Sequence, residues 1–312
     1  MWFGNSFSLG RYWGIDLRVD YSWFIIFFLI VSSLSMGFLP QFYPQLSDVE
    51  YAVLGMVLGV LFFLSVVVHE FAHALYAKAR GIRIDRMVFF LFGGAAEIKD
   101  DSPSPRVEFI MAGLGPLVSY GIAALFGLVW LIGVSSGLVY IEIAGLTLAA
   151  VNAVVATFNM IPAFPLDGGR MLRAVIWKVH GNLERSTRYS SLIGRVFAGL
   201  LVAYGIFLLL SGLIINGIWL VMLGIFLNAA SMQGYMMTRL QAYRNTAVAE
   251  IMQPVTLLEP REPDVDIEGS VLDALEAIQQ RDVLYVGDGD GIVGIVTRRQ
   301  LQAIVDGVRP KV

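Results

Sequence analysis

Long apolar runs separated by short charged segments make up most of the chain. Residues 21–39 contain no charged side chain, and residues 51–79 contain no ionisable acid, base or histidine before His69. Because a helix needs about 20 apolar residues to cross the hydrocarbon core of a bilayer, each run predicts one membrane-spanning helix. Arg11 and Arg18 precede the first run, but no small-residue cleavage site follows it, so we expect this run to be retained.

The run from residue 109 to residue 166 is too long for a single span. Its 58 residues contain one charged side chain, Glu142, and at about 1.5 Å per helical residue they would cross the bilayer nearly three times. The segment Gly-Val-Ser-Ser-Gly at residues 133–137 favours a turn. We therefore expect the third and fourth spans at about residues 107–132 and 139–160.

A further run of 43 uncharged residues extends from residue 196 to residue 238. The same argument divides it near Asn216-Gly217 and gives the fifth and sixth spans. The predicted fold class is therefore mainly α, a bundle of six transmembrane helices.

Lys and Arg are concentrated in alternate loops. The expected loops at 40–50, 133–138 and 214–216 contain none, whereas residues 78–106 and 170–188 contain eleven. Since cytoplasmic loops carry the excess of positive charge in membrane proteins, we expect the basic loops and both termini on the cytoplasmic side.

Composition agrees with a multi-pass cell-membrane protein, because 57% of the residues are hydrophobic, 15% are charged and the mean hydropathy is +0.70. Residues 239–312 hold 20 of the 47 charged side chains. We therefore expect a membrane domain over residues 1–238 and a cytoplasmic domain over residues 239–312. A net charge of −3 and a pI near 5.7 argue against nucleic-acid binding, because no excess of basic side chains is available to neutralise phosphates.

The second apolar run contains His-Glu-Phe-Ala-His at residues 69–73. His69 and His73 are four residues apart and share one helix face, where neutral imidazoles can bind one zinc ion. Glu70 lies about 100° round the helix, which suits a general base better than a ligand. The alternative is a chance pattern or two packed polar histidines, but ionisable side chains in a membrane helix are costly and usually functional. The chain has no cysteine, so a metal site must use histidine and carboxylate.

A third ligand must come from elsewhere in the chain, and Asp167 is the best intramembrane candidate. Pro162 and Pro165 interrupt the fourth span before it, and Gly168-Gly169 follows it. Irregular backbone at membrane depth is tolerated chiefly where it lines a site or a cavity. The alternative is that Asp167 is the N-cap of a helix beginning at Gly168.

The two segments carry complete motifs: His-Glu-Phe-Ala-His at residues 69–73 and Asn-x-x-Pro-x-x-Pro-Leu-Asp-Gly-Gly at residues 159–169. In both, the chain resembles the site-2 protease family of intramembrane zinc metalloproteases, over residues 1 to about 238. The resemblance implies three ligands for Zn²⁺: His69, His73 and Asp167. It also implies that Glu70 is the catalytic base and that Asn159 helps to hold the substrate or to stabilise the oxyanion.

The fold of that family, a membrane helical core with a small embedded sheet, bears on residues 82–98. This segment alternates at Ile82 and Ile84, continues as Met-Val-Phe-Phe-Leu-Phe-Gly-Gly and is short for another span. We expect a strand or hairpin that dips into the membrane beside the site, with an edge that can pair with an unwound substrate. A plain amphipathic connector is the alternative.

The tail predicts a small α/β module. A capped helix begins at Ser270, a hairpin over 283–286 and 292–296 encloses a Gly-Asp-Gly-Asp-Gly turn at 287–291, and a helix follows over 299–305. This order resembles one cystathionine-β-synthase-type (CBS) module. Because such modules pair, the resemblance implies a homodimer through the tail.

Paired CBS modules often bind ATP or another adenine nucleotide through a Thr-x-x-Asp motif. Here Thr297 is followed by Arg298 and Arg299 and then by Gln300 in place of Asp. The chain therefore departs from the motif at the residue that contacts the ribose, while two arginines could still meet phosphates. Two expectations therefore stand for Thr297 and Arg298: a nucleotide site, or a dimerisation module without a ligand.

These observations predict an intramembrane zinc metalloprotease that hydrolyses peptide bonds within or near the transmembrane segments of membrane-protein substrates. Its partners would be such a substrate and the lipid bilayer. One alternative is a transporter or channel gated by the CBS module, in which intramembrane His and Asp coordinate ions. Another is an inactive metal-binding scaffold.

Overall fold

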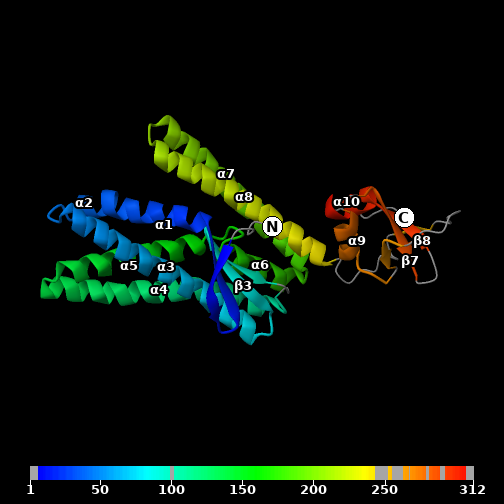
Figure 1. Cartoon of the computed structure of the whole chain (residues 1–312), viewed down its shortest axis with the longest axis horizontal. Helices are drawn as coiled ribbons and strands as arrows, with labels where there is room; N and C mark the ends of the chain where they lie inside the picture. The colour runs from blue at the N-terminus through cyan, green and yellow to red at the C-terminus, as the bar shows by residue number, and fades with distance from the viewer. Residues whose placement is uncertain are drawn as a thin grey trace. The chain divides into compact units, whose positions relative to one another are not determined.

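A computed structural model describes residues 6–98, 102–242, 252–254, 263–266, 268–278, 281–288 and 292–306. The chain divides into two compact units (Figure 1). One comprises Met1–Asn182 with Tyr189–Ala229, and the other comprises Leu183–Arg188 with Ala230–Val312. A boundary between a membrane domain and a cytoplasmic domain at residue 238 remains a prediction.

Six segments of the described chain are long and apolar enough to cross a membrane. The first, Ser22–Phe42, consists of α1 (Ser22–Ser33), a short π-helical turn (Leu34–Phe38) and α2 (Leu39–Phe42). The other five are formed by single helices: α3 (Asp48–Ala79), α4 (Pro105–Ser136), α5 (Val139–Asn159), α7 (Leu183–Leu210) and α8 (Ile214–Ala242). The prediction of six spans is confirmed, and the chain is a multi-pass membrane protein.

The helix ends follow local signals in the sequence. α3 begins with a capping box in which the Ser47 hydroxyl accepts from the backbone N–H of Glu50 and the Glu50 carboxylate accepts from the backbone N–H of Ser47. α4 ends at Gly137, which adopts the left-handed conformation with φ of 68°. The predicted turn at residues 133–137 is therefore confined to its last residue, because the preceding four still belong to α4.

The predicted division of the last apolar run near Asn216-Gly217 is wrong. The turn between α7 and α8 lies at residues 211–213, where Gly212 has a φ of 85°. Gly217 lies inside α8 instead, and a Cβ there would come within 2.7 Å of the carbonyl oxygen of Gly205 in α7. This glycine serves close helix packing, which a sequence cannot distinguish from a turn signal.

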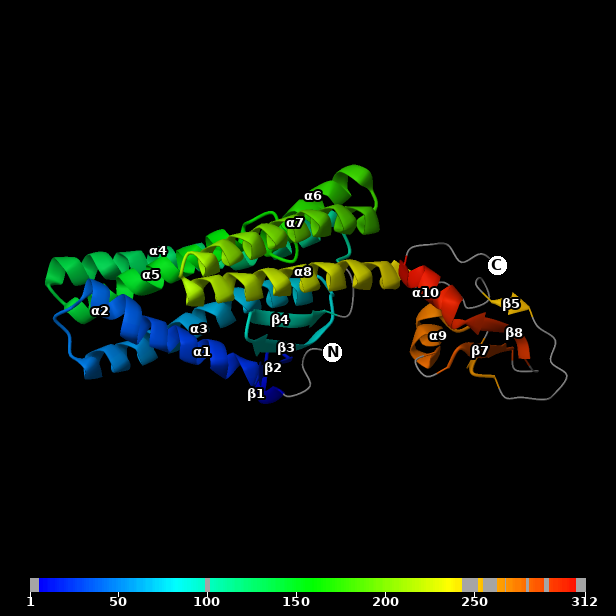
Figure 2. The ribbon, with the colours of Figure 1, turned by 90° about the horizontal axis from the view of Figure 1, so that it is seen from above.

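A four-stranded sheet accompanies the helices of the first unit. Its order is β1 (Ser6–Tyr12), β2 (Ile15–Asp20), β3 (Ile84–Phe90) and β4 (Gly93–Ile98), as Figure 2 shows. β1 and β2 are antiparallel, β2 and β3 are parallel, and β3 and β4 are antiparallel. The predicted hairpin within residues 82–98 is confirmed, and the plain connector is wrong.

The sheet packs on the second half of α3. Alternate residues of β2 are buried and share one hydrophobic core with residues of β3 and α3: Ile15, Leu17, Val19, Met87, Phe89, Phe71 and Ala74. Burying each of the larger side chains contributes about 1.5–3 kcal/mol. The sheet is therefore fixed against the turns of α3 that carry the His-Glu-Phe-Ala-His motif.

The second unit contains a smaller sheet with the order β5-β8-β7-β6. Its strands are β5 (Gln253–Pro254), β6 (Val265–Asp266), β7 (Val283–Gly287) and β8 (Ile292–Thr297), and its two short helices are α9 (Val271–Ala277) and α10 (Arg298–Asp306). The predicted capped helix, hairpin and final helix of the tail are confirmed. Residues 289–291 of the predicted hairpin turn lie outside the described residues.

Candidate active site

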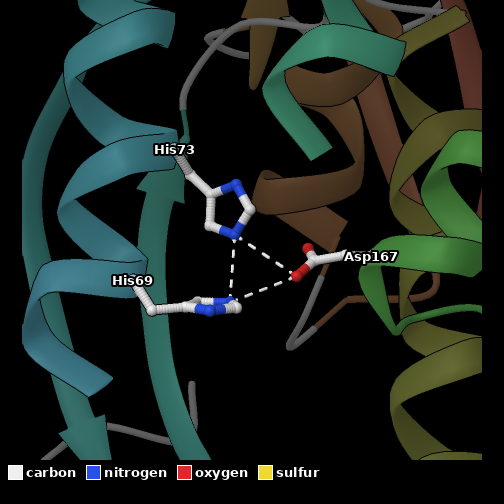
Figure 3. Close-up of side chains that lie close together, drawn as sticks. All are labelled: His69, His73 and Asp167. Atoms are coloured by element: carbon white, nitrogen blue, oxygen red, sulfur yellow. Dashed lines mark hydrogen bonds and ion pairs between the residues drawn. The ribbon is translucent and has the colours of Figure 1, made fainter. Parts of the chain in front are cut away.

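His69 and His73 lie one turn apart on a buried face of α3, with 3% and 7% of their surfaces exposed. Their Nε2 atoms are 3.3 Å apart. Asp167 Oδ2 lies 3.2 Å from the Nε2 atom of His69 and 3.3 Å from that of His73. Figure 3 shows the three side chains turned toward one another. Within the described residues, this is the one group of His, Asp and Glu side chains with ligand atoms close enough to share a metal ion.

Asp167 reaches the histidines from the first residue of α6 (Asp167–His180). No side chain caps this helix, and the carboxylate of Asp167 faces the histidines. The alternative interpretation of Asp167 as an N-cap is therefore wrong. The following glycine lets the helix start close to the preceding loop, since a Cβ on Gly168 would lie 2.2 Å from the carbonyl oxygen of Met160.

The three ligand atoms fit a tetrahedral zinc ion. Metal–ligand distances of about 2.0–2.1 Å place two tetrahedral ligands about 3.3–3.4 Å apart, and the observed separations are 3.2, 3.3 and 3.3 Å. Gly115 of α4 has no side chain and therefore leaves room for an ion next to the two Nε2 atoms. A Cβ there would lie 2.1 Å from His73 Nε2 and 2.5 Å from His69 Nε2. The donor set and its surroundings therefore suit Zn²⁺.

α4 also orients both imidazole rings. His73 donates from Nδ1 to the carbonyl oxygen of Met111 at 2.6 Å, and His69 Nδ1 lies 2.9 Å from the hydroxyl oxygen of Ser119. Histidines that bind metals use their second ring nitrogen in this way, which fixes the ring and leaves the lone pair of Nε2 for the metal. Met111, Gly115 and Ser119 follow one another at intervals of four residues, so one face of α4 serves the site.

Glu70 lies beside the three candidate ligands and outside their group. Its side chain is partly buried and faces β4, because a Cβ on Gly94 would lie 2.6 Å from Glu70 Cγ and 2.9 Å from Cδ. The strand therefore requires a glycine where it passes this carboxylate. The role of Glu70 as the base remains a prediction that agrees with its position.

Asn159 ends α5 and is partly buried. It does not belong to the group of three ligands. Its predicted role in holding the substrate or stabilising the oxyanion remains a prediction.

Thr297 and Gln300 are engaged in a capping box at the start of α10. The hydroxyl and the backbone N–H of Thr297 both donate to Gln300 Oε1 at 2.8 Å, and Thr297 Oγ1 accepts from the backbone N–H of Gln300 at 3.3 Å. Arg298 donates from Nη2 to the carbonyl oxygens of Ile278 and Arg281, at 3.1 and 2.8 Å. These contacts give both predicted nucleotide residues a structural role and do not support nucleotide binding.

Four residues around the cluster escaped the sequence analysis: Gly94, Met111, Gly115 and Ser119. The small residues at 115 and 119 indicate a closely packed face of the third span. Nothing in the sequence pattern identifies the helix that this face contacts.

Comparison with known proteins agrees with the geometry. Residues 57–143 and 140–204 match Peptidase family M50. Rip3 of Mycobacterium tuberculosis, a zinc metalloprotease by name, is 31% identical over 310 residues, which are 98% of this chain and 77% of the relative. Zinc metalloprotease MJ0392 of Methanocaldococcus jannaschii is 31% identical over 268 residues, 84% of this chain and 70% of the relative.

A solved structure is similar as well. The site-2 protease from Methanocaldococcus jannaschii superposes with a TM-score of 0.52 and 28% sequence identity, over 73% of this chain and 94% of that structure. The matched family region contains the two histidines of α3 and the first residue of α6, which form the group that could hold a metal ion. The alternative of a transporter or channel disagrees with these relatives, which are zinc metalloproteases by name. The chain belongs to peptidase family M50, the site-2 proteases, and is a membrane-embedded zinc metalloprotease.

Proposed function

We propose that this protease holds one zinc ion with His69, His73 and Asp167 and uses Glu70 as its general base to cleave membrane-protein substrates within or near their transmembrane segments. The observation that carries the proposal is the buried triangle of ligand atoms with edges of 3.2, 3.3 and 3.3 Å beside a carboxylate that is not a ligand. An ion-coupled carrier needs no such carboxylate beside two histidines at zinc spacing.

Zinc, when bound, supplies a Lewis acid that polarises the scissile carbonyl and makes water a nucleophile near neutral pH. Glu70 accepts the proton of the attacking water and passes it to the nitrogen of the leaving amine. The hydrogen bonds from α4 hold both imidazoles in place before the substrate arrives, so little reorganisation is needed during the reaction.

The substrate must be extended where it is cut, because the peptide bonds of a helix are hidden by their own side chains and backbone hydrogen bonds. β4 is the last strand of its sheet, and its Gly94 lies against Glu70. We propose that the unwound segment adds to β4 as a further strand, which places its peptide bonds beside the base. Substrates with Gly, Pro or polar residues near the cleavage point would unwind most readily.

The orientation in the membrane follows from loop charge. The Lys and Arg residues of 78–106 and 170–188 favour a cytoplasmic location for both loops, and with six spans both termini share that side. His73 lies six residues before the end of α3 at Ala79. The site is therefore proposed to lie within the membrane toward the cytoplasm, from which water would reach it.

The tail is proposed to act as a single CBS-type module that pairs with the tail of a second copy. The support is the order of elements, with α9 before the β7–β8 hairpin and α10 after it. ATP binding at Thr297 and Arg298 would have to displace the contacts that both side chains make within the module.

The proposal is tested with the full chain in liposomes that contain single-span membrane proteins as candidate substrates. Mass spectrometry of the products should find cuts within or next to the transmembrane segment that depend on added zinc. Glu70→Gln is the matched control, because it preserves the size of the side chain and removes the base. Cleavage at an undiminished rate by this variant would contradict the assignment of Glu70.

A further inference from the structure

The face of α4 that serves the zinc ligands includes a fourth residue, Glu108. It precedes Met111 by three residues, and Met111, Gly115 and Ser119 follow at intervals of four, so all four lie on one side of the helix. The last three meet the histidines directly. Glu108 is completely buried, and its hydrogen-bond partner is Arg173 of α6.

Glu108 forms an ion pair with Arg173 of α6. Arg173 donates from Nε to Glu108 Oε1 at 2.6 Å, and its Nη2 contacts the same oxygen. Only 12% of the Arg173 side chain and none of the Glu108 side chain is exposed. α6 begins at Asp167, the third proposed ligand, and α4 orients the two histidines. The ion pair therefore connects the two helices that position the site.

Arg173 also contacts the loop on the other side of Asp167. Its guanidinium carbon lies 5.2 Å from the centre of the Phe164 ring, a cation–π contact, and Phe164 is 7% exposed. The backbone of Phe164 in turn lies against α6, because a Cβ on Gly169 would come within 2.1 Å of Phe164 N. One arginine therefore restrains the chain both before and after the ligand.

Arg170, the nearer arginine, restrains Asp167 less. Its Nη1 atom is 4.0 Å from Asp167 Oδ1, and its Nη2 atom is 3.9 Å from the sulfur of Met111. Neither contact has the length of a strong charge-assisted hydrogen bond, which is about 2.7–2.9 Å. The position of the Asp167 oxygen that faces the histidines thus depends on the placement of α6 as a whole.

Stability alone does not explain a buried pair of this kind. The attraction between two buried charges often fails to offset their desolvation, and an apolar pair of similar volume is often as stable or more stable. Glu108 Oε2 in addition has no hydrogen-bond partner among the described residues, which adds to the cost of burial. The pair does fix the relative orientation of α4 and α6, because an Arg–carboxylate contact constrains the geometry of the groups that it joins.

We infer that Glu108 and Arg173 are positioning residues that hold Asp167 at the metal position and thereby set the zinc affinity of the site. The inference rests on the proposed ligand set. It adds a role for two residues that neither bind the metal nor take part in the chemistry.

The test compares the detergent-purified full chain with a double variant, Glu108→Leu with Arg173→Met, which removes both charges and keeps similar volumes. Supporting contacts around metal ligands typically set affinity by about 10- to 100-fold. We expect zinc affinity to fall by that factor and the visible absorption of the Co²⁺-loaded protein to weaken, while the melting temperature of the metal-free protein stays equal or rises. Lys178→Met, an exposed change on the same helix, is the matched control and should bind zinc like the wild type.

Zinc affinity of the double variant within about twofold of wild type would overturn the inference. If the double variant does not fold, Glu108→Gln decides, because it keeps the size of the side chain but replaces the charge-assisted contact with Arg173 by a weaker neutral one. A several-fold loss of zinc affinity in this variant supports the inference, and wild-type affinity overturns it. Asp167→Ala separates the two proposals: if it binds zinc like the wild type, the ligand set itself is wrong, whereas loss only in Asp167→Ala leaves the ligand set intact and removes the positioning role.

Discussion

Gly115→Ala should disable the zinc site while leaving the fold intact. The new Cβ would lie 2.1 Å from His73 Nε2 and 2.5 Å from His69 Nε2, whereas ordinary contacts begin at 3.4 Å. At His73 the new Cβ would thus be about 1.3 Å closer than an ordinary contact allows. Either the imidazoles or α4 must move by about this amount, and because Zn–N bonds are about 2.0–2.1 Å long, a displacement of about 1 Å takes a nitrogen out of bonding range. We therefore expect zinc affinity to fall about 100-fold, the upper end of the range for disturbed metal sites.

The fold should survive this substitution, because alanine is favoured over glycine inside a helix by about 1 kcal/mol. Gly121→Ala is the matched control: it lies on the same helix, and its Cβ would meet nothing within 4 Å. Titration of the metal-free protein with Zn²⁺ against a chromophoric chelator measures the affinity, and thermal unfolding measures the stability. Zinc affinity of Gly115→Ala equal to that of Gly121→Ala would refute the placement of α4 against the histidines.

Three further predictions concern the base, the strand beside it and the tail. Glu70→Gln should keep its zinc and lose about 10²- to 10⁴-fold in cleavage rate, the usual contribution of a general base, as measured by zinc content and a cleavage assay on one preparation; zinc loss would instead make it a ligand. Gly94→Ala would set a Cβ 2.6 Å from Glu70 Cγ, so cleavage should fall with zinc retained, and an unchanged rate would remove β4 from the site. Thr297→Ala should destabilise the tail by about 1 kcal/mol through loss of the cap of α10, measured by chemical denaturation; unchanged stability would contradict the capping box.

The membrane helices were predictable from the sequence because each requires a long apolar run, and the bilayer sets its length. The turn between α7 and α8 was not predictable, because Gly212 and Gly217 are equally good turn signals. Only the close approach of Gly217 to Gly205 shows that Gly217 serves helix packing and that the turn lies at Gly212. The β1–β2 hairpin was overlooked although Ile15, Leu17 and Val19 alternate with polar residues, a clear strand pattern.

The three residues of the candidate metal site were predictable for a different reason. Two histidines four residues apart on a helix are a known metal-binding pattern, and Asp167 is an acid in an otherwise apolar segment. The side chains that support them are ordinary in sequence: Ser119 and Glu108 gain their roles only when α4 is placed against α3 and α6. Contacts between helices far apart in the chain carry no local sequence signal, so these supporting side chains could be identified only from the structure.

The most direct test of the account is the metal content of the detergent-purified full chain, measured by elemental mass spectrometry beside His73→Ala and Asp167→Ala. The account predicts zinc in the wild type at a ratio near one ion per chain, and its loss in both variants, because three ligands at 3.2–3.3 Å spacing share one ion. Full zinc content in Asp167→Ala, or a wild type that stays empty after reloading with zinc, would contradict it.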